Sequence, residues 1–234
     1  MDFEPREIRP IAYIKTDFSQ KFGIPRQSGR VSSLRGRIVF LPEYRSRESL
    51  REIESFSHLW LIFDFSLAHR EGWTPTVRPP RLGGNKRVGV FASRSPFRPN
   101  SMGLSCVALV KVEYGTEDGD VLIVGGADLL DNTPIYDIKP YLPYADSKPD
   151  AKGGYADMQA GYKLKVEIDE SFLTLIPEVK REALIECLGD DPRPSYKDDG
   201  ERVYKMAFAN VEVSFKVEDG VLTVTDVTEI HEKC

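Results

Sequence analysis

The chain has 234 residues, 41% of them hydrophobic, and a formal net charge of -5. A chain of this length forms one large domain, or one domain with a small appendage, and can bury a core, so the composition predicts a soluble globular protein. No stretch approaches the roughly 18 apolar residues of a membrane helix, and the acidic, polar N-terminus is unlike a signal peptide, so we expect no membrane association and a cytoplasmic location.

The three cysteines, Cys106, Cys187 and Cys234, are an odd number and show neither CxxC nor Cys/His spacing. This arrangement argues against a disulfide framework and against structural zinc, so we predict no metal. Cys106 and Cys187 fall in apolar stretches and are expected to lie in the core.

Short strands separated by loops are predicted for the first third of the chain. The strands are expected at 8–16, 36–42 and 58–67. A short helix is expected at 46–56, with Ser46 as its N-cap. Glycines and a proline predict a loop at 17–29, in which Pro25 stiffens a turn that presents Arg26 and Gln27.

The middle of the chain continues the same pattern. Further strands are expected at 87–93, 104–114 and 120–130. Strands that recur at short intervals, with few helices, favour a mainly β fold, an antiparallel β-barrel or sandwich, over a doubly wound sheet. No dinucleotide-binding or phosphate-loop motif is present. His58, at a strand start, and His69, in a polar turn, are interpreted as a hydrogen-bonded structural residue and a solvated one.

A proline-rich stretch at 140–154 is predicted to end a first domain of residues 1–155, and residues 156–234 are predicted to form a small α+β unit. The unit is expected to contain a strand at 161–169, a helix at 176–190, and a hairpin at 202–227 that turns at Asp219-Gly220. Its loop at 191–201 holds an arginine between two prolines, beside a tyrosine. Such a pair suits RNA phosphate contact or base stacking, and a plain solvent loop is the alternative.

Basic residues are concentrated between Gly72 and Val112, where there are seven basic side chains and no acid, so the other 193 residues sum to -12 (-5 minus 7). Residues 1–112 carry 19 basic and 10 acidic groups (+9), and residues 113–234 carry 13 and 27 (-14). This asymmetry predicts an anionic partner, such as nucleic acid, on the first half. The alternative is that the two oppositely charged halves dock on each other.

Five segments carry a resemblance to a known family: GIPRQ (23–27), SFSHLWLIF (55–63), TPTVRPPRLGGNKRVGVFASRSPFRPNSMGLS (74–105), DLLDNTPIYDIKPYLPYADS (128–147) and DPRPSY (191–196). In this order they resemble the TrmO (TsaA/YaeB) family of tRNA methyltransferases over nearly the whole chain. The resemblance implies a β-barrel methyltransferase domain with a small C-terminal domain, working as a homodimer. It further implies an S-adenosylmethionine-dependent enzyme that methylates N6 of threonylcarbamoyl-adenosine at tRNA position 37, beside the anticodon.

The resemblance also implies which residues contact the cofactor and the tRNA. The cofactor contacts fall on Pro25, Arg26, Gln27, Ser66, Leu67, Arg94, Leu104, Asp128, Leu129, Leu130 and Asp131. The tRNA-engaging residues of the C-terminal loop are Asp191, Arg193, Pro194 and Tyr196, and the basic residues Arg81, Lys86 and Arg87 are left to meet tRNA phosphates. The chain departs from the family at Ser66, where other members often carry His, at Ser101-Met102, where Pro-Ile is common, and at Asn132, where Gly is usual. Asn tolerates a left-handed turn better than most residues.

Methyl transfer from a sulfonium is an in-line displacement, so positioning is the main requirement. The zwitterionic cofactor suits Arg26 or Arg94 for its carboxylate, the Asp128/Asp131 pair for its amine or ribose, and Leu104 with Leu129 as apolar walls. The catalytic base stays unassigned, with Asp128, Asp131, Tyr141 and the substrate's own carboxylate as candidates. The rival interpretations are a β-barrel module that senses the cofactor without transferring methyl, and a methyltransferase for another RNA or a small molecule.

Overall fold

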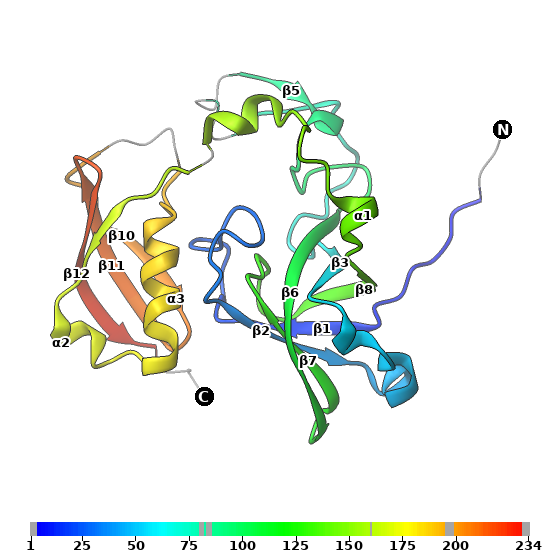
Figure 1. Cartoon of the computed structure of the whole chain (residues 1–234). Helices are drawn as coiled ribbons and strands as arrows, with labels where there is room; N and C mark the ends of the chain where they lie inside the picture. Colours follow the sequence, from blue (N-terminus) through cyan, green and yellow to red (C-terminus); the bar gives the residue numbers. More distant parts are fainter. Residues whose placement is uncertain (1–3, 80–81, 83–85, 160, 195–198, 231–234) are drawn as a thin grey trace.

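The computed structural model describes residues 4–79, 82, 86–159, 161–194 and 199–230. Six antiparallel strands close into a barrel in the order β1, β2, β7, β6, β3, β8, in the lower right of Figure 1. Their bounds are β1 (Ala12–Lys15), β2 (Arg35–Phe40), β3 (His58–Asp64), β6 (Met102–Thr116), β7 (Gly119–Gly125) and β8 (Thr133–Pro140). The fold is therefore mainly β, and the predicted barrel is confirmed.

The barrel interior is filled by apolar side chains that alternate along each strand. On β3, Leu59, Leu61 and Phe63 are buried, whereas the residues between them are only partly covered. The aromatic, β-branched sequence of this strand suits its central position between β6 and β8. Gly103 on β6 stands where an added Cβ would lie 2.2 Å from the Phe63 ring, so the absence of a side chain there lets the ring fill the barrel.

Two elements predicted for this half differ from the structure. The helix predicted at 46–56 is wrong: the segment forms two short 3₁₀ turns, Arg47–Leu50 and Ile53–Ser55, because Glu52 lies in the left-handed region (φ 67°) and interrupts the helix. The strand predicted at 87–93 shortens to β5 (Val88–Gly89), which pairs with β4 (Thr76–Val77) in a separate two-stranded sheet. The described residues of 72–101 are therefore mostly loop, and the part that bears β5 stands above the barrel in Figure 1, whereas residues 102–112 belong to β6.

The strand β8 has no counterpart in the sequence-based prediction. It contains a proline near each end, Pro134 and Pro140, and its apolar alternation is weak, so the pattern resembled a proline-rich loop. In the structure β8 pairs with both β1 and β3 and closes the barrel. Closure therefore depends on a strand that is recognisable only from its two neighbours.

The C-terminal part is a four-stranded sheet of order β10, β11, β12, β9, covered by one helix. Its elements are β9 (Lys165–Glu167), β10 (Tyr204–Phe208), β11 (Val211–Glu218), β12 (Val221–Glu229), α2 (Glu170–Leu173) and α3 (Glu178–Gly189); α1 (Pro143–Asp146) precedes them. The turn at Asp219 and Gly220 is confirmed, since both have positive φ (47° and 77°). The 202–227 segment, however, holds parts of three strands instead of two. No helix in the described part of the chain is long and apolar enough to span a membrane.

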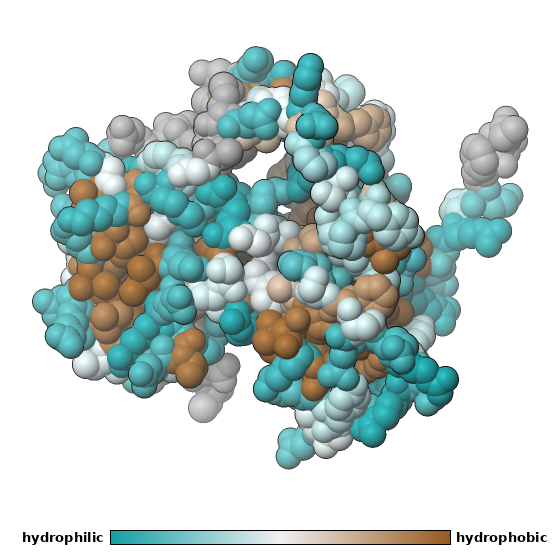
Figure 2. All heavy atoms as spheres, in the orientation of Figure 1, coloured by the Kyte–Doolittle hydropathy of each residue, from teal (hydrophilic) through white to brown (hydrophobic). Residues whose placement is uncertain are grey.

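The loop at 17–34 joins the two parts of the molecule. Phe18, Val31 and Leu34 of this loop belong to the same buried cluster as α3 and the C-terminal sheet. The Phe18 ring meets the Phe208 ring edge-on, with centroids 5.6 Å apart. The predicted cofactor loop thus leaves the barrel and is held by the C-terminal core. Figure 2 shows the surface hollowed between the segment that bears β5 and the barrel below it.

Candidate functional site

The predicted site residues leave the barrel at one end. Antiparallel pairing sets Ile14 opposite Thr133, Arg35 opposite Gly125, and Asp64 opposite Met102. The loops at 16–34, 65–101 and 126–132 therefore begin and end at the same rim. We refer to this rim, with its three loops, as the upper rim.

Asp128 is the carboxylate at the centre of the upper rim. The Ser105 hydroxyl donates to Asp128 Oδ1 over 2.6 Å, and the backbone N–H of Ser28 also donates to the carboxylate. Burial raises the pKa of Asp128 above its ordinary value, while these hydrogen bonds and the nearby Arg94 charge act in the opposite direction. A partly buried, fixed carboxylate of this kind can accept hydrogen bonds from a ribose or attract a cationic group.

Two glycines bring the loops of the upper rim into contact. The N–H of Gly29 donates to the Gly126 carbonyl over 2.9 Å, and Gly126 has φ 71°. A Cβ on Gly126 would lie 3.1 Å from both Cα and N of Gly29. The close approach therefore needs glycine, and it sets the Gln27–Ser28 turn against the loop that carries Asp128.

Asp131 has a different environment from Asp128. Its Oδ1 accepts the N–H of Thr16 over 2.9 Å, and its Oδ2 accepts the Asn132 amide over 2.7 Å. Asn132 has φ 60°, so this position is left-handed, a conformation that Asn tolerates better than most residues. Asp131 thus holds the loop to β1. The two carboxylates that the sequence predicted as a pair therefore have different hydrogen-bond environments.

Arg94 reaches the cofactor loop, since its Nη1 donates to the side-chain oxygen of Gln27. Arg94 is exposed. Its bond to Gln27 orients the planar guanidinium and therefore sets the directions of the other N–H groups. Gln27 in turn donates from its amide to the Arg26 carbonyl. Gln27, Arg94 and Asp128, predicted from three separate segments, are therefore brought together.

Arg26 turns the other way, toward the C-terminal part. Its Nη2 donates to the carbonyl oxygen of Arg193. Burial lowers the pKa of Arg26, and the neighbouring Asp191 and Asp190 carboxylates oppose that shift. Of the two arginines considered for the cofactor carboxylate, Arg94 is the accessible one.

The C-terminal loop residues Asp191 and Arg193 form a buried pair. Arg193 Nε and Nη2 donate to the two carboxylate oxygens of Asp191 over 2.9 and 3.0 Å, and Arg193 is only 9% exposed. This bidentate pair holds the carbonyl that Arg26 contacts. Nearby, Arg30 binds the buried Asp190 carboxylate, with Nε 2.6 Å from Oδ1. The Arg30–Asp190 pair joins a basic residue of the first half to an acid of the second, in agreement with the alternative in which the oppositely charged halves dock on each other.

Other predicted residues lie elsewhere. Ser66 and Leu67 are exposed beyond the end of β3, and the Leu67 carbonyl accepts from Lys21 over 3.0 Å. Leu104 is 57% exposed and alternates with the inward Ser105, so its side chain points to the outer face of the barrel. Leu129 is 1% exposed, and its side chain belongs to the barrel core instead of forming a wall of the site.

Three further expectations concern residues away from the centre of the upper rim. Tyr141 lies past the far end of β8, where its N–H donates to the His58 carbonyl, so it is at the opposite end of the barrel from Asp128. Lys86 and Arg87 are exposed, as a phosphate contact requires. Arg81 and Tyr196 lie outside the described residues.

Sequence reasoning missed two residues that orient the site. Ser105 is a hydroxyl at an inward position of an otherwise apolar strand, and that break in the pattern was a usable signal. The Thr16 hydroxyl donates to the Leu129 carbonyl over 3.0 Å, a contact across 113 residues that no local pattern indicates. Both act by holding the Asp128 loop.

The residue types at the upper rim fit S-adenosylmethionine. The exposed Arg94 suits its carboxylate, and the oriented Asp128 carboxylate suits its ribose or ammonium group. Backbone of the Pro25–Gln27 turn stands within reach of both, because Ser28 contacts Asp128 directly. The fit to the cofactor therefore rests on the hydrogen-bond donors of Arg94 and the acceptor oxygens of Asp128, which Gln27 and Ser105 orient.

Two family models match the chain. The model described as "tRNA-methyltransferase O N-terminal domain" matches residues 13–147, and the "TrmO C-terminal domain" matches residues 162–230. The first match contains the whole barrel and the upper rim, and the second contains α3 and the four-stranded sheet.

Individual relatives agree with these matches. The chain is 41% identical over 221 residues to the tRNA (adenine(37)-N6)-methyltransferase of Escherichia coli, covering 91% of this chain and 94% of the relative. It is 47% identical over 177 residues to the enzyme of the same name from Eikenella corrodens, covering 76% and 99%. A crystal structure of TrmO from Pseudomonas aeruginosa superposes with a TM-score of 0.76 and 33% identity, covering 96% of this chain and all of that chain (100%).

Proposed function

The chain belongs to the TrmO family, and we propose from this premise that it methylates N6 of adenosine 37 in tRNA, on the threonylcarbamoyl-modified nucleoside. It is an S-adenosylmethionine-dependent methyltransferase, as members of this family are. The observation that carries the proposal is the convergence of Gln27, Arg94 and Asp128 on one rim of a closed barrel.

The chain's own residues supply binding and orientation. In this proposal Arg94 holds the cofactor carboxylate, and Asp128 accepts from the ribose or faces the ammonium group. The Pro25–Gln27 turn forms the wall between them. When bound, S-adenosylmethionine supplies an electrophilic methyl group, so the acceptor nitrogen needs only to be held in line and close to contact.

The acceptor is an adenine N6 that is already acylated, so its lone pair is delocalised and loss of its proton assists attack. Of the side chains considered as base, Asp131 is engaged with Thr16 and Asn132, and Tyr141 lies at the far end of the barrel. Asp128 and the substrate's own carboxylate are the candidates that we keep. Burial raises the pKa of Asp128, which makes its carboxylate a stronger proton acceptor.

The tRNA is expected to bind to basic residues of the segment between Gly72 and Val112 and to the C-terminal loop. We propose that exposed Lys86 and Arg87 meet phosphates, and that the C-terminal loop, including Pro194, engages the RNA. Asp191 and Arg193 would act by fixing the shape of this loop. As parts of the same proposal, the chain divides into residues 1–155 and 156–234, acts as a homodimer, and works in the cytoplasm.

The proposal is tested by nucleoside mass spectrometry of tRNA incubated with the protein and S-adenosylmethionine. We expect one added methyl on the position-37 nucleoside of tRNA that carries threonylcarbamoyl-adenosine, and none on tRNA that lacks this group. Equal methylation of both RNAs would remove the substrate assignment, and cofactor binding without any methylated nucleoside would support a cofactor-sensing module instead.

A calorimetric titration tests the cofactor site separately. Arg94→Ala removes a charge-assisted contact, so we expect S-adenosylmethionine affinity to fall by about 10- to 100-fold. Arg45→Ala serves as the matched control, because Arg45 donates to the Phe40 carbonyl at the opposite end of the barrel. Wild-type affinity in the Arg94 variant would contradict the assignment.

A further inference from the structure

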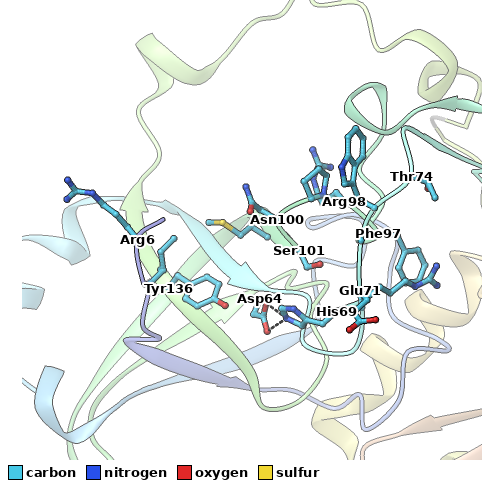
Figure 3. Close-up of a pocket in the computed structure, with 17 residues that line it drawn as sticks. Arg6, Asp64, His69, Glu71, Thr74, Phe97, Arg98, Asn100, Ser101 and Tyr136 are labelled. Carbon is cyan, nitrogen blue, oxygen red and sulfur yellow. Dashed lines mark hydrogen bonds and ion pairs between the residues drawn. The ribbon is translucent and has the colours of Figure 1, made fainter. Parts of the chain in front are cut away.

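A cavity lies beside the upper rim, on the outer face of the barrel. We refer to it as the second cavity, to distinguish it from the proposed cofactor site at Gln27, Arg94 and Asp128. Its volume is about 600 Å³, within the range of pockets that hold small ligands. Its wall comes from the ends of β3 and β6, from β8, and from the loops at 68–74 and 97–101. Figure 3 shows the labelled side chains arranged around this space.

Aromatic rings form part of the wall and are exposed. Trp73 is 53% exposed and Phe97 is 37% exposed. The Arg70 guanidinium carbon lies 3.5 Å from the centroid of the Phe97 ring, which is a stacked cation–π contact. Exposed aromatic rings beside arginine are the arrangement on which single-stranded nucleic-acid bases stack.

Polar side chains also line the cavity. His69 Nε2 lies 2.9 and 3.0 Å from the two Asp64 oxygens, as the dashed lines in Figure 3 show. Tyr136 lies beside the same carboxylate, and its pKa is raised by burial and by Asp64. His69, interpreted from the sequence as solvated, is indeed exposed but is oriented by an acid. These groups offer a donor and acceptor set to a polar ring edge.

The net charge of the wall favours an anion-bearing ligand. Arg6, Arg70 and Arg98 line the cavity, and Asp64 and Glu71 are the described acids there. The Arg98 side chain donates from Nη1 to the Ser93 carbonyl over 3.1 Å. The combination of arginine, exposed rings and polar side chains matches a nucleotide better than an apolar molecule.

The cavity shares its wall with the proposed cofactor site. Ser66 and Leu67 lie between Asp64 and Ala68, both of which line the cavity. The segment that follows Arg94 lines it from Phe97 to Met102, two residues before Leu104. The N–H of Phe65 donates to the Ser101 carbonyl over 2.8 Å, which fixes the two loops together.

We propose that this cavity receives an unstacked nucleobase of the tRNA anticodon loop, with Trp73 and Phe97 as the stacking surface and the Asp64–His69 pair facing the base edge. The inference rests on the proposed function, because the tRNA substrate is part of that proposal. It adds a contact site separate from Lys86 and Arg87 and from the C-terminal loop. Bases of a loop are available for such insertion because they are not held in a duplex.

The chain has two tryptophans, Trp60 and Trp73, which gives a direct readout. Trp60→Phe leaves Trp73 as the fluorescent residue, and Trp60 lies away from the cavity, with its indole N–H on Asp146. We expect the Trp73 emission of this variant to be quenched when an anticodon stem-loop RNA is added. Trp73→Phe, which retains Trp60, should show no quenching at the same RNA concentrations.

Affinity for the same RNA, measured by fluorescence anisotropy of labelled RNA, provides the second test. Trp73→Ala and Phe97→Ala should each weaken binding by about tenfold, the effect of losing one base–aromatic stack. Tyr44→Ala is the matched control, because Tyr44 is an exposed aromatic residue (36%) at the opposite end of the barrel. It should bind RNA as the wild type does.

The outcomes separate this inference from the proposed function. RNA that binds and is methylated without quenching Trp73 would overturn the inference alone. Quenching by RNA without methylation would support the inference and overturn the proposed function. If Trp73→Ala changes the sedimentation of the free protein but not its RNA affinity, the cavity wall is a contact between copies of the chain, and the inference is wrong.

Discussion

Two neighbouring regions around the upper rim hold arginine side chains in opposite ways. At the contact between residues 24–31 and 190–193, Arg26, Arg30 and Arg193 bind carbonyls or carboxylates of the chain itself. In the second cavity, by contrast, Arg70 covers an aromatic ring and lies among exposed side chains. Charges already satisfied within the chain position other residues, whereas accessible charges beside exposed rings can bind a ligand.

The difference shows why charge counts along the sequence do not identify a binding surface. Arg193 and Arg87 are both arginines of loops that the sequence assigned to tRNA. Arg193 is 9% exposed and pairs with Asp191, while Arg87 is exposed and makes one bond, to the Thr76 hydroxyl over 2.9 Å, among the contacts described. The first therefore belongs to the internal contact and the second to the surface.

The largest effect is expected from neutralising the internal contact. Asp191→Asn keeps a side chain that tolerates the left-handed backbone of this position (φ 54°) but removes the charge that faces the buried Arg193. We expect the free energy of unfolding to fall by about 2–3 kcal/mol in urea denaturation. Cofactor affinity should fall with it, since Arg26 bonds to the Arg193 carbonyl.

The control for that variant is Glu212→Gln, which neutralises an exposed pair with Lys205 (2.6 Å). An exposed pair contributes less than about 1 kcal/mol, so this variant should be close to the wild type. If Asp191→Asn and Glu212→Gln lose the same stability, the distinction between internal and surface charges fails for this protein.

A smaller loss of stability is expected at the backbone contact between Gly126 and Gly29, where no charge is involved. Gly126→Ala places a Cβ 3.1 Å from Gly29 in a left-handed residue (φ 71°), so strain and displacement should cost about 2 kcal/mol and weaken cofactor binding. Gly220→Ala has a similar φ (77°) with no atom within 4 Å, and should cost about 1 kcal/mol. Thermal unfolding and cofactor titration of both variants measure the difference; equal losses would mean that the loop contact is not tight.

The next effect concerns Asp128, whose folded-state pKa is raised by burial. Because the protonated form is favoured in the fold, the ionised form costs folding free energy at neutral pH, and this cost disappears as the pH falls toward the ordinary value of about 3.9. Asp128→Asn should therefore be more stable than the wild type at pH 7, with the difference shrinking in acid, and should bind cofactor about tenfold more weakly. A stability difference that grows in acid would contradict this sign.

The smallest effect is expected at the exposed surface. Arg87→Ala should leave stability unchanged and reduce the slope of log affinity for tRNA against log salt concentration by about 0.7–0.9, the contribution of one phosphate contact. Anisotropy titrations over a range of salt concentrations measure this slope. An unchanged slope would remove Arg87 from the RNA surface and leave the second cavity as the contact still to be tested.

Much of the fold followed from local pattern. The strands β3 and β6, the helix α3 and the turn at Asp219-Gly220 were all predicted from short apolar runs, helix-end residues and turn chemistry. The errors fell where local pattern is weak. The 46–56 segment has helical spacing but contains Glu52 in a left-handed conformation. The strand β8 contains two prolines and depends on pairing with β1 and β3.

The sequence by itself determined the residue types of the site and, through the family resemblance, the segments that carry them. Only the tertiary structure decided which of these residues are available. Asp128 and Asp131 read alike in the sequence, but Ser105 orients the first and Thr16 engages the second. The cavity is lined by Trp73 of a loop and Tyr136 of β8, which are far apart in the sequence, and no local pattern encodes such an arrangement. The physical reason is that side-chain burial and hydrogen bonding are set by neighbours in space, which the barrel closure supplies.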